Sequence, residues 1–141
     1  MSQEHVLIAT LGLDQHENGA IAVARILREA QMKVGYLGRF NTPATIVEAV
    51  RIQAPDVVGV SCHSWEYLEL APDLVRRLRE AGLDTPVVIG GSVITAGDAA
   101  RMREAGVAGV VHGAVSDDAI VEVIRGAARA HRDGESGVIG P

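Results

Sequence analysis

The sequence predicts a doubly wound α/β domain built on a five-stranded parallel sheet. Short, continuously apolar runs alternate with longer segments in which apolar residues recur every three or four positions. The first pattern is typical of parallel strands that are covered on both faces, and the second is typical of amphipathic helices. Strict alternation of five such strands with five such helices indicates a single doubly wound domain.

Local signals place each element in turn. The predicted strands are residues 6–10, 32–37, 57–61, 87–89 and 107–111. The predicted helices begin near Ala20, at Thr42, after Tyr67, near Thr95, and at Ser116 or Asp117. Thr42-Pro43 supplies an N-cap followed by a first-turn proline. Pro72 lies inside the third helical pattern and is expected to shorten or kink its first turn.

We expect the flavodoxin-like strand order 2-1-3-4-5. Sheets of this kind bind ligands beyond the carboxyl ends of the strands, at the point where the direction of strand addition reverses. In this order that point lies between the first and third strands. Because His16 follows the first strand and Ser61 ends the third, both residues are expected at the rim of the crevice.

The stretch Asp14-Gln15-His16-Glu17-Asn18-Gly19 connects the first strand to the first helix. An aspartate two residues before a histidine can accept a hydrogen bond from one imidazole nitrogen, which leaves the other nitrogen available to a metal. Gly19 would let the backbone approach a large group closely. Taken alone, these residues are more typical of a solvated loop, but their place at the predicted crevice favours a ligand role.

Composition excludes several classes of function. The 141 residues suit one domain, expected over residues 1–133, with a glycine-rich tail at 134–141 that we expect to be disordered. The net charge of -5 argues against sequence-independent binding of nucleic acid. Cys62 is the only cysteine, which excludes an internal disulfide and multi-cysteine metal sites. No segment resembles a membrane span or a signal peptide, so a cytoplasmic location is expected.

Three motifs together resemble the cobalamin-binding domain of adenosylcobalamin-dependent mutases. They are Asp14-x-His16-x-x-Gly19 after the first strand, Ser61 at the end of the third, and Gly90-Gly91 at the end of the fourth. The resemblance extends from about Val6 to Ile124. Thr42-Pro43 and Pro72 favour the acyl-CoA mutase branch, which includes methylmalonyl-CoA mutase, over the glutamate mutase branch.

The resemblance implies a definite mode of cofactor binding. Adenosylcobalamin would bind with its own base displaced from cobalt, His16 would be the lower axial ligand, and Asp14 would hold the histidine. The displaced nucleotide tail would lie between the first and third strands, with Ser61 hydrogen-bonded to its base. Gly90 and Gly91 would let the tail pass against bare backbone. His63 is interpreted either as a lining residue of this slot or as a solvent-facing loop histidine.

The resemblance also implies an assembly. The chain would be the small, cofactor-binding subunit of an isomerase, inactive alone, and a barrel-type large subunit would supply the substrate site. Three features depart from the family pattern: Thr10 stands where a basic residue is common, His63 where a leucine usually follows the serine, and residues 112–115 replace a Gly-Pro-Gly-Thr-like turn.

Other interpretations remain open at this stage. A cobalamin carrier, chaperone or sensor without turnover, or a glutamate mutase-type small subunit, would share these motifs. A corrinoid methyl-transfer protein, a receiver domain and a flavodoxin are less favoured. Cys62 is expected to be a small buried apolar residue. Trp65 and Tyr67 fit a cover over the pocket, a partner surface or core packing.

Overall fold

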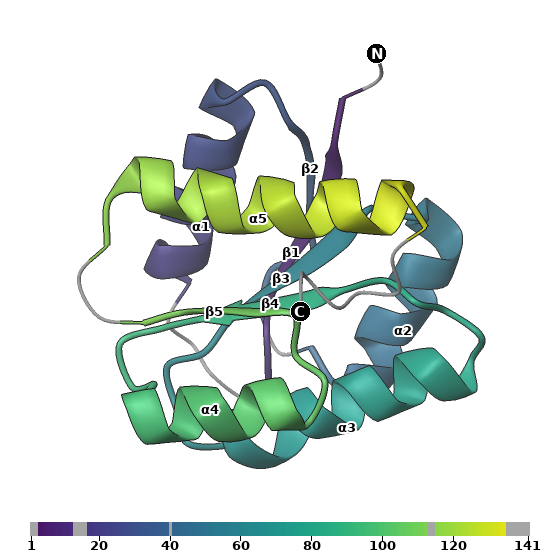
Figure 1. The fold of residues 1–141 in the computed structure, drawn as a ribbon, viewed down its shortest axis with the longest axis vertical. Helices are drawn as coiled ribbons and strands as arrows, with labels where there is room; N and C mark the ends of the chain where they lie inside the picture. The colour runs from purple at the N-terminus through teal and green to yellow at the C-terminus, as the bar shows by residue number, and fades with distance from the viewer. Residues whose placement is uncertain (1–2, 13–16, 40, 113–114, 135–141) are drawn as a thin grey trace.

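The computed structural model describes residues 3–12, 17–39, 41–112 and 115–134. Asp14 and His16, on which the axial-ligand prediction falls, lie outside the described residues, and so does the predicted tail from residue 135 onward. Strand and helix alternate strictly (Figure 1). The elements are β1 (His5–Thr10), α1 (Asn18–Glu29), β2 (Lys33–Tyr36), α2 (Pro43–Gln53), β3 (Val57–Ser61), α3 (Tyr67–Glu80), β4 (Val87–Gly90), α4 (Ala96–Glu104), β5 (Gly109–Val111) and α5 (Asp117–Arg132).

The strands form one parallel sheet in the order β2-β1-β3-β4-β5, so the predicted topology is confirmed. The register pairs Thr10 with Ser61 and Ser61 with Gly90. The last residues of β1, β3 and β4 therefore stand side by side at the carboxyl edge of the sheet. This edge is where the fold is expected to bind a ligand.

Helices α1 and α5 cover one face of the sheet, and α2, α3 and α4 cover the other (Figure 1). Because successive strand residues point to opposite faces, Leu7 and Ala9 belong to the core under α2, α3 and α4. Val6 and Ile8 belong to the core under α1 and α5. Among the described residues, none of the helices combines the length and apolar character that a bilayer crossing requires. The cytoplasmic location stays a prediction.

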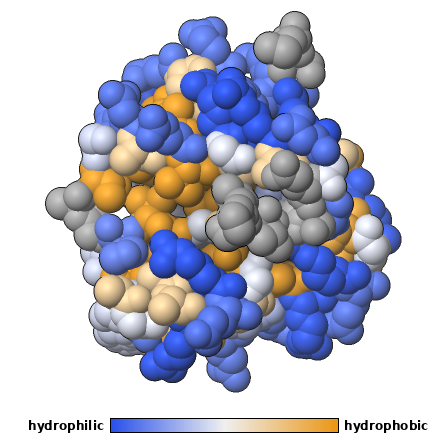
Figure 2. All heavy atoms as spheres, in the orientation of Figure 1, coloured by the Kyte–Doolittle hydropathy of each residue, from blue (hydrophilic) through white to orange (hydrophobic). Residues whose placement is uncertain are grey.

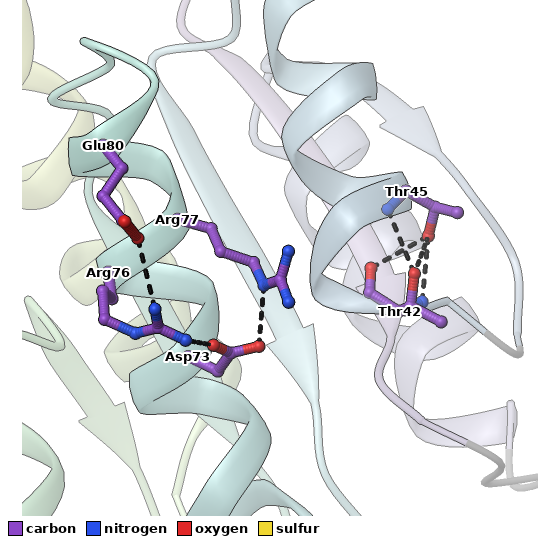
Figure 3. A network of polar contacts seen from close by, with 6 residues as sticks. All are labelled: Thr42, Thr45, Asp73, Arg76, Arg77 and Glu80. Atoms are coloured by element: carbon purple, nitrogen blue, oxygen red, sulfur yellow. Dashed lines mark hydrogen bonds and ion pairs between the residues drawn. The ribbon is translucent and has the colours of Figure 1, made fainter.

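The predicted helix starts are confirmed where a hydroxyl side chain caps the helix. Thr42 and Thr45 bond reciprocally at the start of α2: the Thr45 N–H donates to Thr42 Oγ1 over 3.1 Å, and the Thr42 N–H donates to Thr45 Oγ1 over 2.9 Å (Figure 3). Thr95 and Ser116 cap α4 and α5 with a single bond each, accepted by the side chain from a first-turn N–H.

One predicted helix start needs correction, and Pro72 does not shorten its helix. Helix α1 begins at Asn18 rather than near Ala20, so Gly19 lies in the first helical turn and not in the preceding loop. Helix α3 continues from Tyr67 to Glu80 through Pro72. On its exposed side, Asp73 pairs with Arg76 and Arg77, and Arg76 also pairs with Glu80 (Figure 3), at the three- and four-residue spacings that support a helix.

Candidate functional site

A pocket opens between the sheet and the two helices α1 and α5, toward the carboxyl edge. Ile8, Gly59 and Val88 form its sheet side, while Ala20 and Ile124 contribute from the helices. Apolar atoms gather around a hollow below α5 in the space-filling view (Figure 2). The cavity volume is about 240 Å³. Since pockets for drug-sized ligands measure about 300–1,000 Å³, this one suits a single flat ring system.

The polar side chains of the pocket lie at its rim. They are Ser61, at the end of β3, His63, two residues later, and Ser92, after β4. Ser61 Oγ and His63 Nε2 lie 3.0 Å apart and share one hydrogen bond, whose donor depends on the imidazole tautomer. Of the described residues that line the pocket, none is Asp, Glu, Lys or Arg. The site therefore offers hydrogen bonds to a neutral group within apolar walls.

Gly19 packs directly against this polar pair. A Cβ at position 19 would lie 3.1 Å from His63 Nε2 and 3.7 Å from Ser61 Oγ. A contact of 3.1 Å is tight, so the absence of a side chain allows the first turn of α1 to lie against the pair. The structure thus brings Gly19 against Ser61 and His63, which follow it by more than forty residues in the sequence.

The neighbouring glycines Gly90 and Gly91 also border the pocket, but for different physical reasons. A Cβ at position 91 would lie 1.7 Å from the carbonyl oxygen of Cys62, so the chain's own backbone requires glycine there. A Cβ at position 90 would meet Val111 at 3.5 Å, which is an ordinary contact. The packing of the protein therefore leaves room for a methyl group at Gly90 but not at Gly91.

Two apolar residues of α5 also line the pocket. They are Ile120, which is half-buried, and Ile124, which is buried, and nothing in the sequence indicated that either belongs to a site. Ser92 was not predicted at all. The only sequence signal for it was a hydroxyl directly after a glycine pair at a strand end.

The two aromatic residues after β3 do not line the pocket. Tyr67, the first residue of α3, is buried, and its hydroxyl donates to Asp98 Oδ2 over 3.2 Å. Burial, together with the charge and hydrogen bond of Asp98, raises the pKa of Tyr67 to about 12. Trp65 is 59% exposed and stacks on Tyr67 with ring centroids 6.5 Å apart. Of the three interpretations offered for Tyr67, core packing is thus the correct one, and Cys62 is buried as predicted.

Metal binding by several side chains is not seen in the described part of the chain. Within residues 3–12, 17–39, 41–112 and 115–134, no group of three or more His, Cys, Asp or Glu side chains could hold a metal ion. A role for His16 as a single metal ligand lies outside the described residues and stays a prediction.

Comparison with characterised proteins adds independent evidence. The chain is 40% identical over 120 residues to the 2-hydroxyisobutanoyl-CoA mutase small subunit of Aquincola tertiaricarbonis, covering 85% of this chain and 88% of that protein. It is 31% identical over 119 residues to the pivalyl-CoA mutase small subunit of Xanthobacter autotrophicus, covering 84% and 80% respectively.

A solved structure shares the fold. A cobalamin-binding protein from Desulfitobacterium hafniense superposes with a TM-score of 0.75 at 23% identity, covering 87% of this chain and 58% of that one. Residues 4–124 match the B12 binding domain as a family. This segment contains all five strands and every residue that lines the pocket. The chain therefore belongs to the B12-binding domain family, and cobalamin is its cofactor.

Proposed function

We propose that this chain is the cobalamin-binding small subunit of an adenosylcobalamin-dependent acyl-CoA mutase. It holds the cofactor with the nucleotide tail in the pocket below α1 and α5, and with His16 as the lower ligand of cobalt. The observation that carries the proposal is the pocket itself, an uncharged apolar slot at the carboxyl edge with Ser61 and His63 at its rim.

The pocket fits the displaced base of the cofactor in size and chemistry. Its volume of about 240 Å³ suits a bicyclic heterocycle and excludes the much larger corrin ring. A base that has left cobalt carries a bare ring nitrogen, which needs a hydrogen-bond donor once it is buried. The Ser61 hydroxyl can donate to that nitrogen when His63 Nε2 carries a proton and donates to Ser61 Oγ.

Gly90 offers the bare backbone that a passing tail requires. It shares a face of β4 with Val88, because successive strand residues alternate between faces, and Val88 belongs to the core under α1 and α5. A side chain at position 90 would project toward the pocket. Since the packing of the protein would accept a methyl group there, its absence is explained by a ligand better than by the fold.

The role of His16 is supported by its place in the chain. It lies three residues before Gly19, which contacts the Ser61 and His63 pair. One imidazole nitrogen would bind cobalt, while Asp14 would accept a hydrogen bond from the other and fix the ring orientation. The bound cofactor supplies radical chemistry that no amino-acid side chain of this domain can provide.

The substrate site would come from a barrel-type large subunit. A coenzyme A thioester is far larger than the pocket of about 240 Å³, which the tail would fill. Two relatives of nearly the same length are named small subunits of acyl-CoA mutases, which supports both the partner and the substrate class. Their substrates differ, so the acyl group is left open. We expect no turnover by this chain alone.

The proposal is tested by titrating the purified chain with cobalamin, followed by gel filtration and absorbance. We expect one cofactor per chain with the spectrum of displaced base. In the cobalt(II) form, labelling histidine with nitrogen-15 should change the nitrogen splitting of the paramagnetic resonance, and His16→Ala should abolish that change. A protein that leaves the column colourless would refute the proposal. Binding without turnover beside any acyl-CoA mutase large subunit would favour a carrier.

A further inference from the structure

A second polar cluster joins the start of α1 to the end of β2. The hydroxyl of Tyr36, the last residue of β2, donates to Glu17 Oε1 over 2.6 Å. Arg39 Nε lies 3.8 Å from the other carboxylate oxygen, Glu17 Oε2. Each oxygen of Glu17 therefore has a partner, one at the end of β2 and one just after it. A distance of 2.6 Å is typical of a charge-assisted O–H···O⁻ bond, which is among the stronger hydrogen bonds in proteins.

Glu17 uses its side chain for this contact instead of for its own helix. It occupies the N-cap position of α1 but makes no side-chain capping bond. Thr42, Thr95 and Ser116 at the starts of α2, α4 and α5 all cap their helices. The carboxylate remains favourable near the positive end of the helix dipole. The hydrogen bond from Tyr36, however, determines the direction in which the Glu17 side chain points.

The segment that holds Tyr36 is itself firmly attached to β1. The Leu37 N–H donates to the Ile8 carbonyl over 2.9 Å, and the Thr10 N–H donates to the Gly38 carbonyl over 3.0 Å. The Asn41 amide then donates to the carbonyls of both Thr10 and Gly38, over 3.1 and 2.8 Å. These bonds fix the segment against the sheet and so determine where the Tyr36 phenol lies.

The phenol remains a donor at any physiological pH. Burial, followed by the hydrogen bond to Glu17, raises the pKa of Tyr36 to about 12. The Thr10 hydroxyl is fully buried on the same face of the sheet and makes no hydrogen bond to another described residue.

We propose that Tyr36 is a positioning residue for the axial ligand: by holding Glu17, it sets the carboxyl end of the segment that presents His16 to cobalt. The inference rests on the proposed function, because it concerns how His16 is held. Glu17 directly follows His16 in the chain, so a shift of Glu17 is transmitted through one peptide bond. Neither Tyr36 nor Glu17 lines the tail pocket, so their loss should leave the cofactor bound.

The chain offers a matched control, because its only other tyrosine makes the same kind of bond elsewhere. Tyr67 also donates to a carboxylate, and its pKa is also raised to about 12, but it packs in the core under α2, α3 and α4. Tyr36→Phe and Tyr67→Phe each remove one hydroxyl and nothing else. Only the first should affect cobalt ligation.

The experiment uses the full chain labelled with nitrogen-15 histidine and loaded with cobalt(II) cobalamin. Paramagnetic resonance gives the ratio of histidine-ligated to unligated cobalt, and absorbance titration gives the total affinity. We expect Tyr36→Phe to lower the ligation ratio about 10-fold or more, as losses of residues that orient a metal ligand do. Total affinity should fall much less, and Tyr67→Phe should leave the ratio unchanged.

Variants at Glu17 complete the test. Glu17→Gln keeps an oxygen that accepts the phenol proton and should retain more ligation than Glu17→Ala. In the Glu17→Ala background, Tyr36→Phe should have little further effect, because the two residues act as one unit. Equal ligation in the wild type, Tyr36→Phe and Glu17→Ala would overturn the inference while leaving the proposed function intact. A wild type that binds cobalamin without a histidine nitrogen on cobalt would overturn both.

Discussion

Replacing Gly90 and Gly91 one at a time by alanine should have opposite effects on folding and on cofactor binding. At position 91 the new methyl carbon would lie 1.7 Å from the Cys62 carbonyl oxygen, about half an ordinary contact distance. The obstacle is backbone, so β3 and β4 must separate at their carboxyl ends. Overpacking of this kind costs about 3 kcal/mol, which should lower the Tm by roughly 10 °C for a chain of this size.

At position 90 the same methyl group would meet Val111 at 3.5 Å, a normal contact. Gly90→Ala should therefore keep the wild-type stability, or gain about 0.4–1 kcal/mol because alanine restricts the unfolded chain. The methyl group would instead project into the tail pocket. A misfit worth about 1–3 kcal/mol corresponds to roughly 5- to 150-fold weaker binding of cobalamin.

The assay is a thermal melt of each apo protein, followed by cobalamin titration of the variants that fold. Gly90→Ala should melt with the wild type and bind cobalamin poorly, while Gly91→Ala should melt early. Equal loss of stability in both variants would refute the separation of their roles. Wild-type affinity in Gly90→Ala would show that the tail does not pass this residue.

Three further predictions concern single side chains. Ser61→Ala should fold normally, because Ser61 is half-buried at a strand end. It should bind cobalamin roughly 10-fold more weakly, because the hydrogen-bond donor to the tail is lost. Cobinamide, which lacks the tail, should bind the wild type and Ser61→Ala equally. The pKa of Tyr67 is raised to about 12 in the folded protein, so its protonated phenol stabilises the wild type fully below pH 10. This stabilisation is lost as the pH rises toward 12. In alkaline melts the Tm of the wild type should therefore fall more steeply with pH than the Tm of Tyr67→Phe. Trp65→Ala should leave cobalamin affinity unchanged, since Trp65 does not line the pocket; a large loss of affinity would show that the loop after β3 covers the bound cofactor.

The fold could be predicted from local pattern because each element carries its own signal. Continuous apolar runs predicted the strands, and hydroxyl residues at the N-cap positions predicted the starts of α2, α4 and α5. Helix α1 has no such side-chain cap, and its early residues Asn18 and Gly19 are poor helix formers. Its start is stabilised instead by the packing of Gly19 on Ser61 and His63. Because this is a tertiary contact, the local sequence pattern could not predict it.

The site was only partly predictable. The positions of Ser61, Gly90 and Gly91 at strand ends follow from topology, so their convergence could be expected. The pocket walls could not be distinguished from core, because the same apolar residues fill a core or border a cavity. The Tyr36–Glu17 bond joins residues nineteen positions apart, and it depends on the register of β1 with β2 and on the start of α1.

The pair Gly90 and Gly91 gives a physical reason why site residues could not all be told from structural ones in the sequence. A glycine in a sequence records that a side chain is absent, but not which neighbour occupies the space. At Gly91 the neighbour is the Cys62 carbonyl of the same chain, and at Gly59 it is the Ile8 side chain, 2.7 Å from a Cβ built there. At Gly90 the nearest protein atoms allow a methyl group. Of these three glycines near the pocket, Gly90 is therefore the one whose space is best explained by a ligand, and its substitution tests the site without testing the fold.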